Sequence, residues 1–328
     1  MKVAVLINSN AGRAEPEGIK NSIRRALFRA DLTFYEPTTR EELQTATLEA
    51  AKTSDALIIC GGDGTLNVAV QPLLQHRNTV SIPPILPLPL GTANDLASEL
   101  GISERIERGA RLVLESEPKF IDVIEVSSEA STVYMLTNGG LGVAAETALL
   151  ANDVRQWFRK KPIGSDFVKA LGSEIYELLL AGQFLTGHTR KWLKGWCLSV
   201  ELAEGTSFDT SAPFIMVNNQ PGLGGKYIPA PLTSNTDGTF NVMLVNSPEL
   251  LRQVSALMKM RRGNIPDENI CPRTETTHAR FRAKDGARDL TFFGDGEILQ
   301  SGVRQIDVTC LKRALPVYSQ TAVAEALS

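Results

Sequence analysis

A short apolar segment that runs into a glycine-rich loop constrains the fold of this chain more than any other feature. Residues Ala56–Cys60 are apolar throughout and continue directly into Gly61-Gly62-Asp63-Gly64-Thr65. After the loop, Leu66–Leu74 resumes a helical pattern of apolar side chains. In this setting the glycines let the backbone turn tightly, and the free N–H groups at the helix start face an anion. The sequence therefore predicts a phosphate site where the strand gives way to the helix.

The same alternation of strand and helix patterns extends through the first part of the chain. Strand patterns at Lys2–Ile7, Leu32–Tyr35 and Ile85–Leu90 are separated by helical stretches such as Gly18–Ala30 and Thr39–Lys52. Alternation at this interval is typical of β-α-β units. We therefore expect a largely parallel sheet that is covered by helices on both faces.

Beyond about residue 122 the pattern changes. Short strand-like segments follow one another there, and helical material lies between residues 145 and 181. The remaining strand patterns are Gly195–Glu201, Phe214–Asn218, Thr239–Val245, Ala279–Ala283, Leu290–Phe293 and Gln305–Cys310. Strands joined by short turns predict an antiparallel sheet or sandwich as a second domain.

Composition narrows the class of protein. The chain has 328 residues, of which 43% are apolar, enough for two hydrophobic cores. Its 34 basic and 37 acidic residues give a net charge of -3, which argues against a dedicated nucleic-acid binder. Four cysteines without a C-x-x-C pair indicate a reducing compartment. No apolar run approaches the roughly 20 residues of a membrane-spanning helix, so a cytoplasmic location is expected.

A second loop strengthens the prediction of a phosphate site. In Leu88–Ala97, Gly91 and Thr92 form a turn after a strand, and Asn94-Asp95 opens the next helix. Loops at the carboxyl ends of strands in one parallel sheet face a common crevice, where open α/β folds bind their ligands. The alternative is that Thr92 or Asp95 only caps a helix, as Asp63 could do in the first loop. An acid such as Asp63 is unusual beside a phosphate unless it meets magnesium or a water that binds magnesium.

These two loops resemble those of the diacylglycerol kinase catalytic-domain family, which comprises bacterial lipid kinases with relatives among sphingosine and ceramide kinases. The first loop is shared with NAD kinases and phosphofructokinases, whereas Pro89–Ala97 resembles the more specific G-T-x-N-D-[FL]-A element. The resemblance continues through almost the whole chain. Further matching segments, in order, are Asn8–Gly12, a glycine turn at Asn138–Gly142, Asn218-Asn219, Gly224-Gly225, Asp237-Gly238 and Gly294-Asp295-Gly296-Glu297.

The resemblance implies a fold of the NAD kinase and diacylglycerol kinase type. An N-terminal Rossmann-like parallel α/β domain at residues 1–126 is expected to bind the nucleotide. A mainly antiparallel β-sandwich domain at residues 127–309, with a helical insert at 145–181, is expected to bind the lipid. The segment 310–328 is expected to return to the first domain.

The resemblance also implies roles for individual residues. Glu297 is implied as the general base, with Asp63 and Asp95 also catalytic, and Asp63, Asp95 and Asp122 as the acids that organise Mg²⁺. The residues implied for ATP are Asn8, Asn10, Gly61, Gly62, Gly64, Thr65, Asn67, Gly91, Thr92 and Asn94. Taken from the residues alone, D-G-E is more often a plain hairpin turn, and Asp122 could be an exposed acid at a strand edge.

Two segments depart from the family pattern. The first, Asn8–Gly12, lacks the proline and the serine of the family's N-P-x-S-G segment. The second, Ile228-Pro229-Ala230-Pro231, lacks the acid that helps other bacterial members to bind a structural magnesium in the second domain. Of the acids in that region, Asp237 remains obvious, so the sequence leaves this structural ion open.

The function implied is an ATP-dependent lipid kinase that transfers the γ-phosphoryl group to the hydroxyl of a diacylglycerol-like or related lipid alcohol. The alternatives are an NAD-kinase-like or other small-molecule kinase, and an inactive lipid- or nucleotide-binding module. Peripheral membrane contact is suggested by basic residues beside aromatic residues in Arg155–Lys161 and Lys191–Trp196. A solvated basic helix face with aromatic side chains in the core is the alternative there. The sequence does not indicate an oligomeric state.

Overall fold

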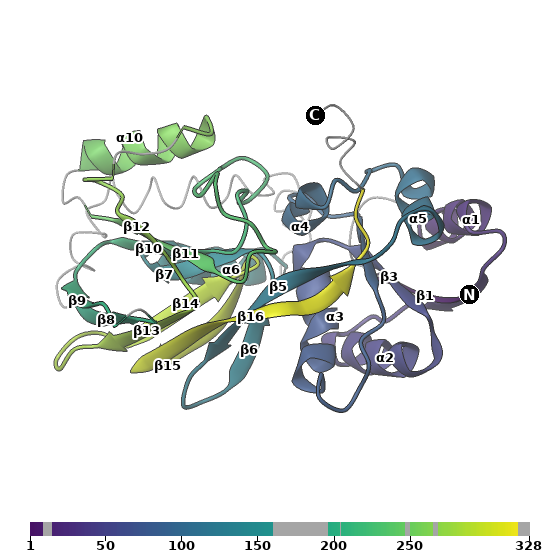
Figure 1. The fold of residues 1–328 in the computed structure, drawn as a ribbon, viewed down its shortest axis with the longest axis horizontal. Helices are drawn as coiled ribbons and strands as arrows, with labels where there is room; N and C mark the ends of the chain where they lie inside the picture. The colour runs from purple at the N-terminus through teal and green to yellow at the C-terminus, as the bar shows by residue number, and fades with distance from the viewer. Residues whose placement is uncertain (9–14, 160–195, 204, 247–249, 265–267, 321–328) are drawn as a thin grey trace. The chain divides into compact units, whose positions relative to one another are not determined.

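The computed structural model describes residues 1–8, 15–159, 196–203, 205–246, 250–264 and 268–320 (Figure 1). Its chain forms two compact units, one of Met1–Val123 with Lys312–Ser328 and the other of Ile124–Leu311. Two strands, β5 (Lys119–Ser127) and β16 (Gln305–Val317), contribute residues to both units.

The first unit contains the predicted parallel sheet. Its strands are β1 (Lys2–Ile7), β2 (Asp31–Tyr35), β3 (Ala56–Gly61) and β4 (Ile85–Pro89), paired in the order β2-β1-β3-β4. The end of β16 joins the sheet beside β4, where Val317 pairs with Ile85 in parallel. All residues of β3 and β4 are buried. Burial on both faces explains why these strands have apolar runs in place of an alternating pattern.

Helices cover both faces of this sheet (Figure 1). They are α1 (Pro16–Ala26), α2 (Arg40–Thr53), α3 (Asp63–Gln75), α4 (Asp95–Glu99) and α5 (Ile106–Glu115). The α2 helix packs against α3, and α1 packs against α5. A capping box begins α2, because the Thr39 side chain accepts the Glu42 N–H while the Glu42 carboxylate accepts the Thr39 N–H.

The second unit is mainly antiparallel, as the sequence predicts. One sheet has the order β12-β11-β10-β7-β14-β15, and the pairs within it are antiparallel. Its strands are β7 (Asn138–Gly142), β10 (Phe214–Asn218), β11 (Phe240–Val245), β12 (Arg273–Thr276), β14 (Leu290–Gly294) and β15 (Glu297–Val303). In the other sheet, β16 continues the order into β13 (His278–Ala283), β8 (Leu198–Leu202) and β9 (Ser207–Thr210), and β5 pairs with β6 (Thr132–Met135).

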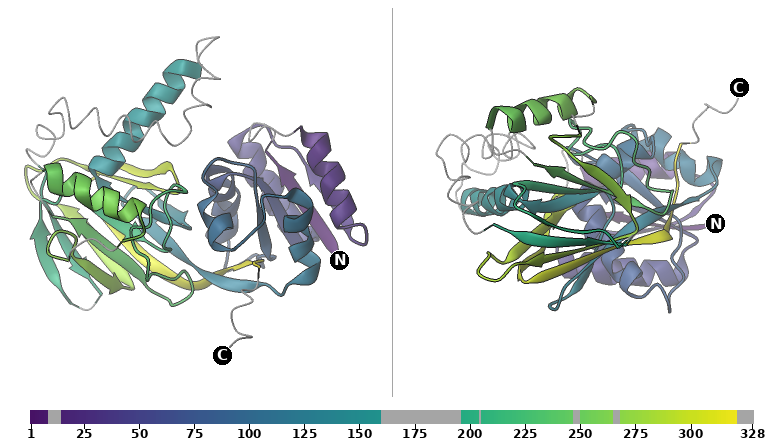
Figure 2. Two further views of the ribbon diagram at one scale, coloured as in Figure 1. Left: turned by 90° about the horizontal axis from the view of Figure 1, so that it is seen from above. Right: turned by 60° about the vertical axis from the view of Figure 1, so that its left-hand side comes forward.

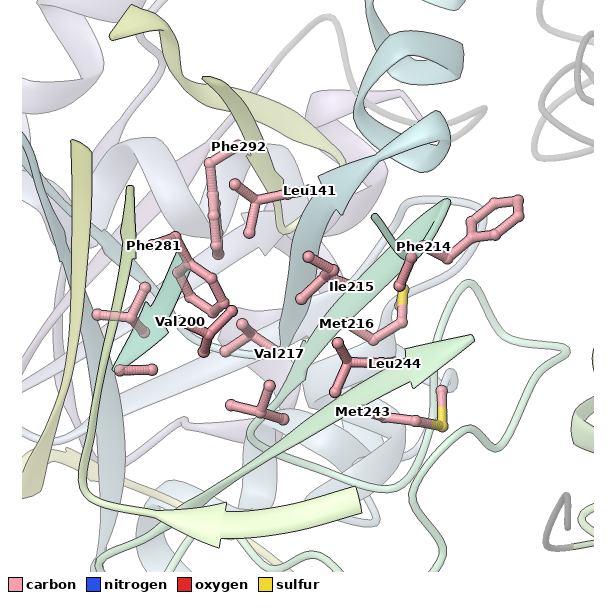
Figure 3. Close-up of a cluster of buried hydrophobic side chains, with 14 of the residues drawn as sticks. Leu141, Val200, Phe214, Ile215, Met216, Val217, Met243, Leu244, Phe281 and Phe292 are labelled. Atoms are coloured by element: carbon pink, nitrogen blue, oxygen red, sulfur yellow. The ribbon is translucent and has the colours of Figure 1, made fainter. Parts of the chain in front are cut away.

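The hydrophobic core of the second unit receives side chains from both of its sheets. Figure 3 shows Val200 and Phe281 pointing toward Leu141, Ile215 and Val217. Two helices, α6 (Val143–Arg159) and α10 (Leu250–Arg261), lie outside the sheets (Figure 2). None of the described helices combines the length and apolar character that crossing a membrane requires.

Two expectations for the second unit need correction. The segment Asn138–Gly142, expected as a turn, is the inner strand β7, which pairs with β10 and with β14. Its glycines are needed because neighbouring carbonyl groups approach the β7 backbone closely. Trp196, expected as a ring at a membrane surface, is buried in the core, and its indole N–H donates to the Ala212 carbonyl at 2.8 Å. The alternative of a core aromatic is therefore correct for this residue.

Candidate active site

The two predicted loops of the first unit lie against each other at the carboxyl edge of its sheet. Gly61 at the end of β3 pairs with Pro89 at the end of β4, and the Leu90 N–H donates to the Gly61 carbonyl at 2.8 Å. Beyond the strands the backbones of Gly62 and Gly91 are in contact, since a Cβ added to Gly91 would lie 2.6 Å from the Gly62 Cα. A side chain at Gly91 would push the loops apart, and a Cβ on Gly62 would stand 3.1 Å from the Gly91 Cα, in a tight contact. The two-loop arrangement thus depends on glycine in both loops.

A small pocket lies where the two loops meet. Its lining residues are Ile59, Gly61, Gly62, Asp63, Leu66, Pro87, Pro89, Asn94 and Ala97. Gly91 and Thr92 lie beside it and are exposed to solvent, and Gly64 is half-buried in the first turn of α3. The site therefore exposes backbone groups of both loops in one place.

Asn8 and Thr65 connect the end of β1 to the first loop. The Asn8 side-chain amide donates to the Thr65 hydroxyl at 2.8 Å, and the Asn8 backbone N–H donates to the Cys60 carbonyl at 3.2 Å. The Thr65 side chain occupies the space where a Cβ on Gly61 would stand, 2.5 Å away. Asn67 is buried within α3, and its amide oxygen accepts a hydrogen bond from Gln71 at 3.1 Å. Asn10 falls outside the described residues.

Asn94 fixes the shape of the second loop. Its backbone adopts a left-handed conformation with φ of 53°. Its side-chain oxygen accepts the Gly91 N–H at 2.9 Å, and its amide nitrogen donates to the Gly91 carbonyl at 2.9 Å. Asparagine suits this place because it tolerates the left-handed region and carries both a donor and an acceptor. The structure therefore shows the Asn94 amide engaged within its own loop.

Asp63 contacts the helix of the other loop. Its carboxylate accepts a hydrogen bond from the Leu96 N–H at 3.4 Å. It also accepts hydrogen bonds from the backbone N–H groups of Asn94 and Asp95. The residue before α3 that serves as its N-cap is Gly62, and no side chain caps that helix. The alternative in which Asp63 caps its own helix is therefore wrong. Neither Thr92 nor Asp95 caps α4, whose N-cap is Asn94.

The three acids expected around magnesium differ in their surroundings. Asp95 is the first residue of α4 and lies beside the Asp63 carboxylate. Asp122 in β5 is fully buried, and its carboxylate accepts the Arg313 N–H at 2.7 Å, so it is not an exposed acid at a strand edge. Across the residues that the structure describes, no three or more acidic, histidine or cysteine side chains gather closely enough to hold a metal ion. The structure thus brings Asp63 and Asp95 together, without completing a three-acid cluster.

Burial raises the pKa of the Asp63 carboxyl, and the backbone N–H groups that favour its ionised form do not fully offset this. A raised pKa in the folded state means that ionised Asp63 destabilises the fold at pH values above the usual aspartate range. We therefore expect Asp63→Asn to raise the midpoint of thermal unfolding at neutral pH in metal-free buffer. The gain should shrink as the pH falls from the raised pKa of the folded chain toward the ordinary pKa of aspartate, below which both folded and unfolded chains are protonated. A lower midpoint at neutral pH would contradict this electrostatic cost.

The second unit contains the expected D-G-E turn between β14 and β15. Gly294 pairs with Glu297, and Asp295 and Gly296 have positive φ values of 51° and 79°. Asp295 is buried, and its carboxylate accepts the Leu136 N–H at 2.8 Å, the Thr137 N–H at 2.8 Å and the Thr137 hydroxyl at 2.6 Å. Asp295 therefore ties the hairpin to the segment before β7. The sequence analysis did not predict that Asp295 holds the hairpin in place. The signal that could have found it is an acid next to glycine in a turn between two strands.

Glu297 follows this turn as the first residue of β15 and is half-buried. Within the described chain, its carboxylate has no hydrogen-bond or ion-pair partner. The two acids of one turn thus differ, because Asp295 is fully engaged with the protein while Glu297 keeps its acceptor capacity. Asp237, the remaining acid of the other departing segment, is exposed and accepts the Thr239 N–H and hydroxyl, both at 2.9 Å.

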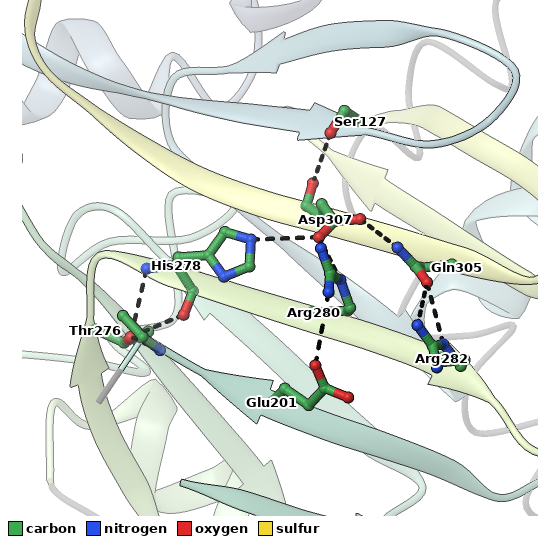
Figure 4. Close-up of polar contacts among 9 residues, drawn as sticks. Ser127, Glu201, Thr276, His278, Arg280, Arg282, Gln305 and Asp307 are labelled. Carbon is green, nitrogen blue, oxygen red and sulfur yellow. Dashed lines mark hydrogen bonds and ion pairs between the residues drawn. The ribbon is translucent and has the colours of Figure 1, made fainter. Parts of the chain in front are cut away.

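A separate polar network covers part of the sheet formed by β8, β13 and β16 (Figure 4). The Asp307 carboxylate accepts Arg280 Nε at 2.7 Å and Gln305 Nε2 at 2.7 Å, and it lies 3.3 Å from His278 Nε2. Burial works against ionisation of Asp307, but the hydrogen bonds from Gln305 and Arg280 and the charges of Arg280 and His278 outweigh it and hold the pKa below its usual value. These groups use one another as partners, so we assign the network to cross-strand stabilisation.

Comparisons with known proteins agree on one family. Residues 2–126 match the model of the diacylglycerol kinase catalytic domain. Lipid kinase YegS of Escherichia coli K12 is 37% identical over 101 residues, covering 30% of this chain and 33% of the relative. A protein of Staphylococcus epidermidis that carries the name of a lipid kinase is 28% identical over 207 residues, covering 63% of this chain and 59% of the relative. The matched regions thus span less than two thirds of these curated relatives.

A solved structure supports the same assignment at the level of the fold. The crystal structure of a diacylglycerol kinase from Bacillus anthracis is 18% identical, covers 98% of both chains and has a TM-score of 0.69. A second Bacillus anthracis structure is 20% identical, with a TM-score of 0.70 and the same coverage. The fold is therefore similar from one end of the chain to the other. Residues 2–126 are therefore similar to the diacylglycerol kinase catalytic domain, and the solved structures extend the likeness in fold to the rest of the chain.

Proposed function

We propose that this protein is an ATP-dependent lipid kinase, which transfers the γ-phosphoryl group to the hydroxyl of a diacylglycerol-like or related lipid alcohol. The observation that carries the proposal is the backbone contact between Gly62 and Gly91, with the Asp63 carboxylate at the start of α4. This contact unites a loop found in several kinase families with a loop that is specific to this family. The match to the catalytic-domain model and the likeness to lipid kinases support a kinase, and the lipid alcohol is the more specific part of the proposal.

The nucleotide phosphates are proposed to bind at the joined loops. Glycine at Gly61, Gly62 and Gly91 lets an anion approach the backbone, and the first turn of α3 offers N–H groups that lack helical partners. In this proposal Asn8 and Thr65 hold the first loop in place, and Asn94 holds the second through its two hydrogen bonds to Gly91. Asn67 supports α3 from inside, since it is 1% exposed. Thr92 is exposed beside the loops and remains a candidate for direct contact with ATP.

The site offers two of the three carboxylates that the sequence predicts as ligands of magnesium. Mg²⁺ prefers oxygen ligands and is usually held by one or two carboxylates together with substrate phosphates. Asp63 and Asp95 are adjacent, and the Asp63 carboxylate has no basic side chain among the groups that affect its pKa. We therefore propose these two residues as the ones that hold the ion. When bound, the ion would offset negative charge on the phosphates. Asp122 stays a predicted member of the set, and its carboxylate already accepts the Arg313 N–H.

Glu297 is proposed as the general base. Phosphoryl transfer to an alcohol is helped by a carboxylate that accepts the hydroxyl proton as the oxygen attacks the γ-phosphorus and the bond to the ADP oxygen breaks. Glu297 suits this role because its carboxylate is free of partners among the described residues. Asp295 does not, because three hydrogen bonds from Leu136 and Thr137 occupy it.

A panel of acceptors tests the proposed function. The purified protein is incubated with labelled ATP and Mg²⁺ and with diacylglycerol, sphingosine, phosphatidylglycerol or NAD, and the products are identified by mass spectrometry. We expect phosphate on a lipid alcohol. Phosphorylation of NAD alone would favour the NAD-kinase-like alternative. Binding of ATP and lipid without transfer to any acceptor would identify an inactive binding module.

A further inference from the structure

The second unit concentrates exposed apolar side chains around the end of α10. Among its described residues, the large apolar side chains that are clearly exposed are Leu150 at 39%, Ile228 at 37%, Leu232 at 85% and Met258 at 45%. Met258 lies on α10, and Ile228 and Leu232 lie in the loop before β11. Three of the four thus belong to two segments that meet. Apolar side chains that gather on a surface indicate a contact with another molecule or with a membrane.

Hydrogen bonds hold these two segments together. The Ile228 N–H donates to the Met260 carbonyl at 2.9 Å, and a Cβ placed on Gly263 would lie 3.3 Å from Ile228 Cδ1. A turn closed by the Thr233 N–H and the Ala230 carbonyl, at 3.0 Å, presents Leu232. The loop and the end of α10 therefore form one continuous surface.

The core fixes which side of α10 faces outward. Ala256 and Met260 are buried and belong to the hydrophobic core of the second unit. Met258 lies between them in sequence and is exposed. Because Ala256 and Met260 anchor the helix in the core, Met258 is held on its outer side.

Basic residues accompany the apolar ones. Lys259, Arg261 and Arg262 are all exposed at the end of α10. Within the described part of the chain, neither Lys259 nor Arg262 has an acidic partner. The surface therefore combines exposed apolar side chains with the positive charges of Lys259 and Arg262, which no acidic partner among the described residues neutralises.

We propose that this α10 surface, made of Ile228, Leu232, Met258, Lys259, Arg261 and Arg262, docks on an anionic lipid bilayer. Apolar side chains that enter the headgroup layer beside lysine and arginine, which meet lipid phosphates, are the chemistry of an interfacial contact. A nucleic acid would match the charges but would leave Leu232 and Met258 in water. The inference rests on the proposed function in one respect: a lipid substrate lies in a bilayer, so the enzyme must bind the bilayer surface to reach it.

A patch of similar composition in the first unit provides a matched control. Phe28 is 74% exposed beside Arg29, whose guanidinium lies over the Phe28 ring at 5.1 Å. Nearby on α1, Arg24 and Arg25 lie 4.0 Å and 2.6 Å from the carboxylates of Glu17 and Glu107. These cations are engaged within the protein, so this patch should contribute little to lipid binding.

The test is co-sedimentation of the full chain with vesicles. Vesicles of phosphatidylcholine alone are compared with vesicles that also contain phosphatidylglycerol. Neutralising the two cations without an acidic partner, in Lys259→Gln with Arg262→Gln, should weaken binding to the anionic vesicles by about 25-fold, at roughly fivefold per cation. Leu232→Ser with Met258→Ser should weaken binding as well, with less dependence on salt. Phe28→Ser with Arg29→Gln should bind like the parent protein.

Kinase assays separate this inference from the proposed function. The α10 variants should phosphorylate a lipid alcohol in detergent micelles at the parent rate and lose activity on vesicles. If the parent protein binds anionic vesicles through α10 but transfers no phosphate in any format, the docking surface stands and the proposed function fails. If the α10 variants keep parent binding to anionic vesicles, or the control variant loses it equally, the docking surface is overturned. Circular dichroism of each variant confirms that the fold is retained.

Discussion

Replacing Glu297 with glutamine is expected to lower the rate of phosphoryl transfer by about 10²–10⁴-fold, the usual contribution of a general base. The carboxylate lies at the start of β15 and has no partner among the described residues, so its loss removes no hydrogen bond from the fold. Glutamine keeps the size of the side chain and removes the ability to accept a proton. Steady-state kinetics should therefore show a lower kcat, with ATP affinity and the unfolding midpoint close to those of the parent protein.

The neighbouring acid provides the matched comparison. Asp295→Ala should lower the free energy of unfolding by about 3 kcal/mol or more, because two buried backbone N–H groups and the Thr137 hydroxyl lose a charged acceptor. The two acids stand two residues apart, yet one substitution should affect catalysis and the other stability. Full activity of Glu297→Gln would mean that another group accepts the proton of the substrate hydroxyl. Equal losses of stability in both variants would mean that Glu297 is structural.

The parallel sheet and the meeting of the two loops could be predicted because local patterns determine them. Ala56–Cys60 is apolar at every position, which is typical of a strand that is covered on both faces. The carboxyl ends of such strands lie at one edge of the sheet, so loops that follow two neighbouring strands must approach each other. The contact between Gly62 and Gly91 is the outcome of that rule.

The roles of individual polar residues in the site were harder to predict. Asn94 was expected to contact the nucleotide, and the structure shows its amide bonded to Gly91. Asn67 was expected at the site and is buried within α3. An asparagine near a glycine turn has the same sequence signal whether it binds a ligand or holds the loop. Its partners are decided by backbone conformation, which one sequence does not reveal.

Long-range contacts account for the remaining differences. The α10 helix was not predicted, although seven of its twelve residues are apolar, because the chain around it is rich in strand patterns. The segment Asn138–Gly142 was expected as a turn because it contains three glycines. Glycine there serves strand packing, and the partners that require it lie in β10 and β14, far along the chain.

The inner strand β7 leads to the largest expected loss of stability. Gly140→Ala should lower the free energy of unfolding by about 4 kcal/mol or more, at the upper end of single substitutions. A Cβ on Gly140 would lie 2.0 Å from the Ile215 carbonyl oxygen, and the residue has φ of 154°. Since β7 is hydrogen-bonded to β10 on one side and β14 on the other, its backbone cannot move away without breaking one of these pairings.

Gly286→Ala separates the effect of backbone conformation from the effect of close packing. Gly286 has φ of 74°, and a Cβ there would meet nothing within 4 Å. Its substitution should cost about 1 kcal/mol, the cost of a side chain in a left-handed conformation. Urea denaturation of both variants gives the comparison. A loss at Gly140 no larger than that at Gly286 would mean that β7 can shift to admit a methyl group. The larger loss would show that glycine is needed in β7 because the carbonyl of the adjacent strand β10 lies against its backbone.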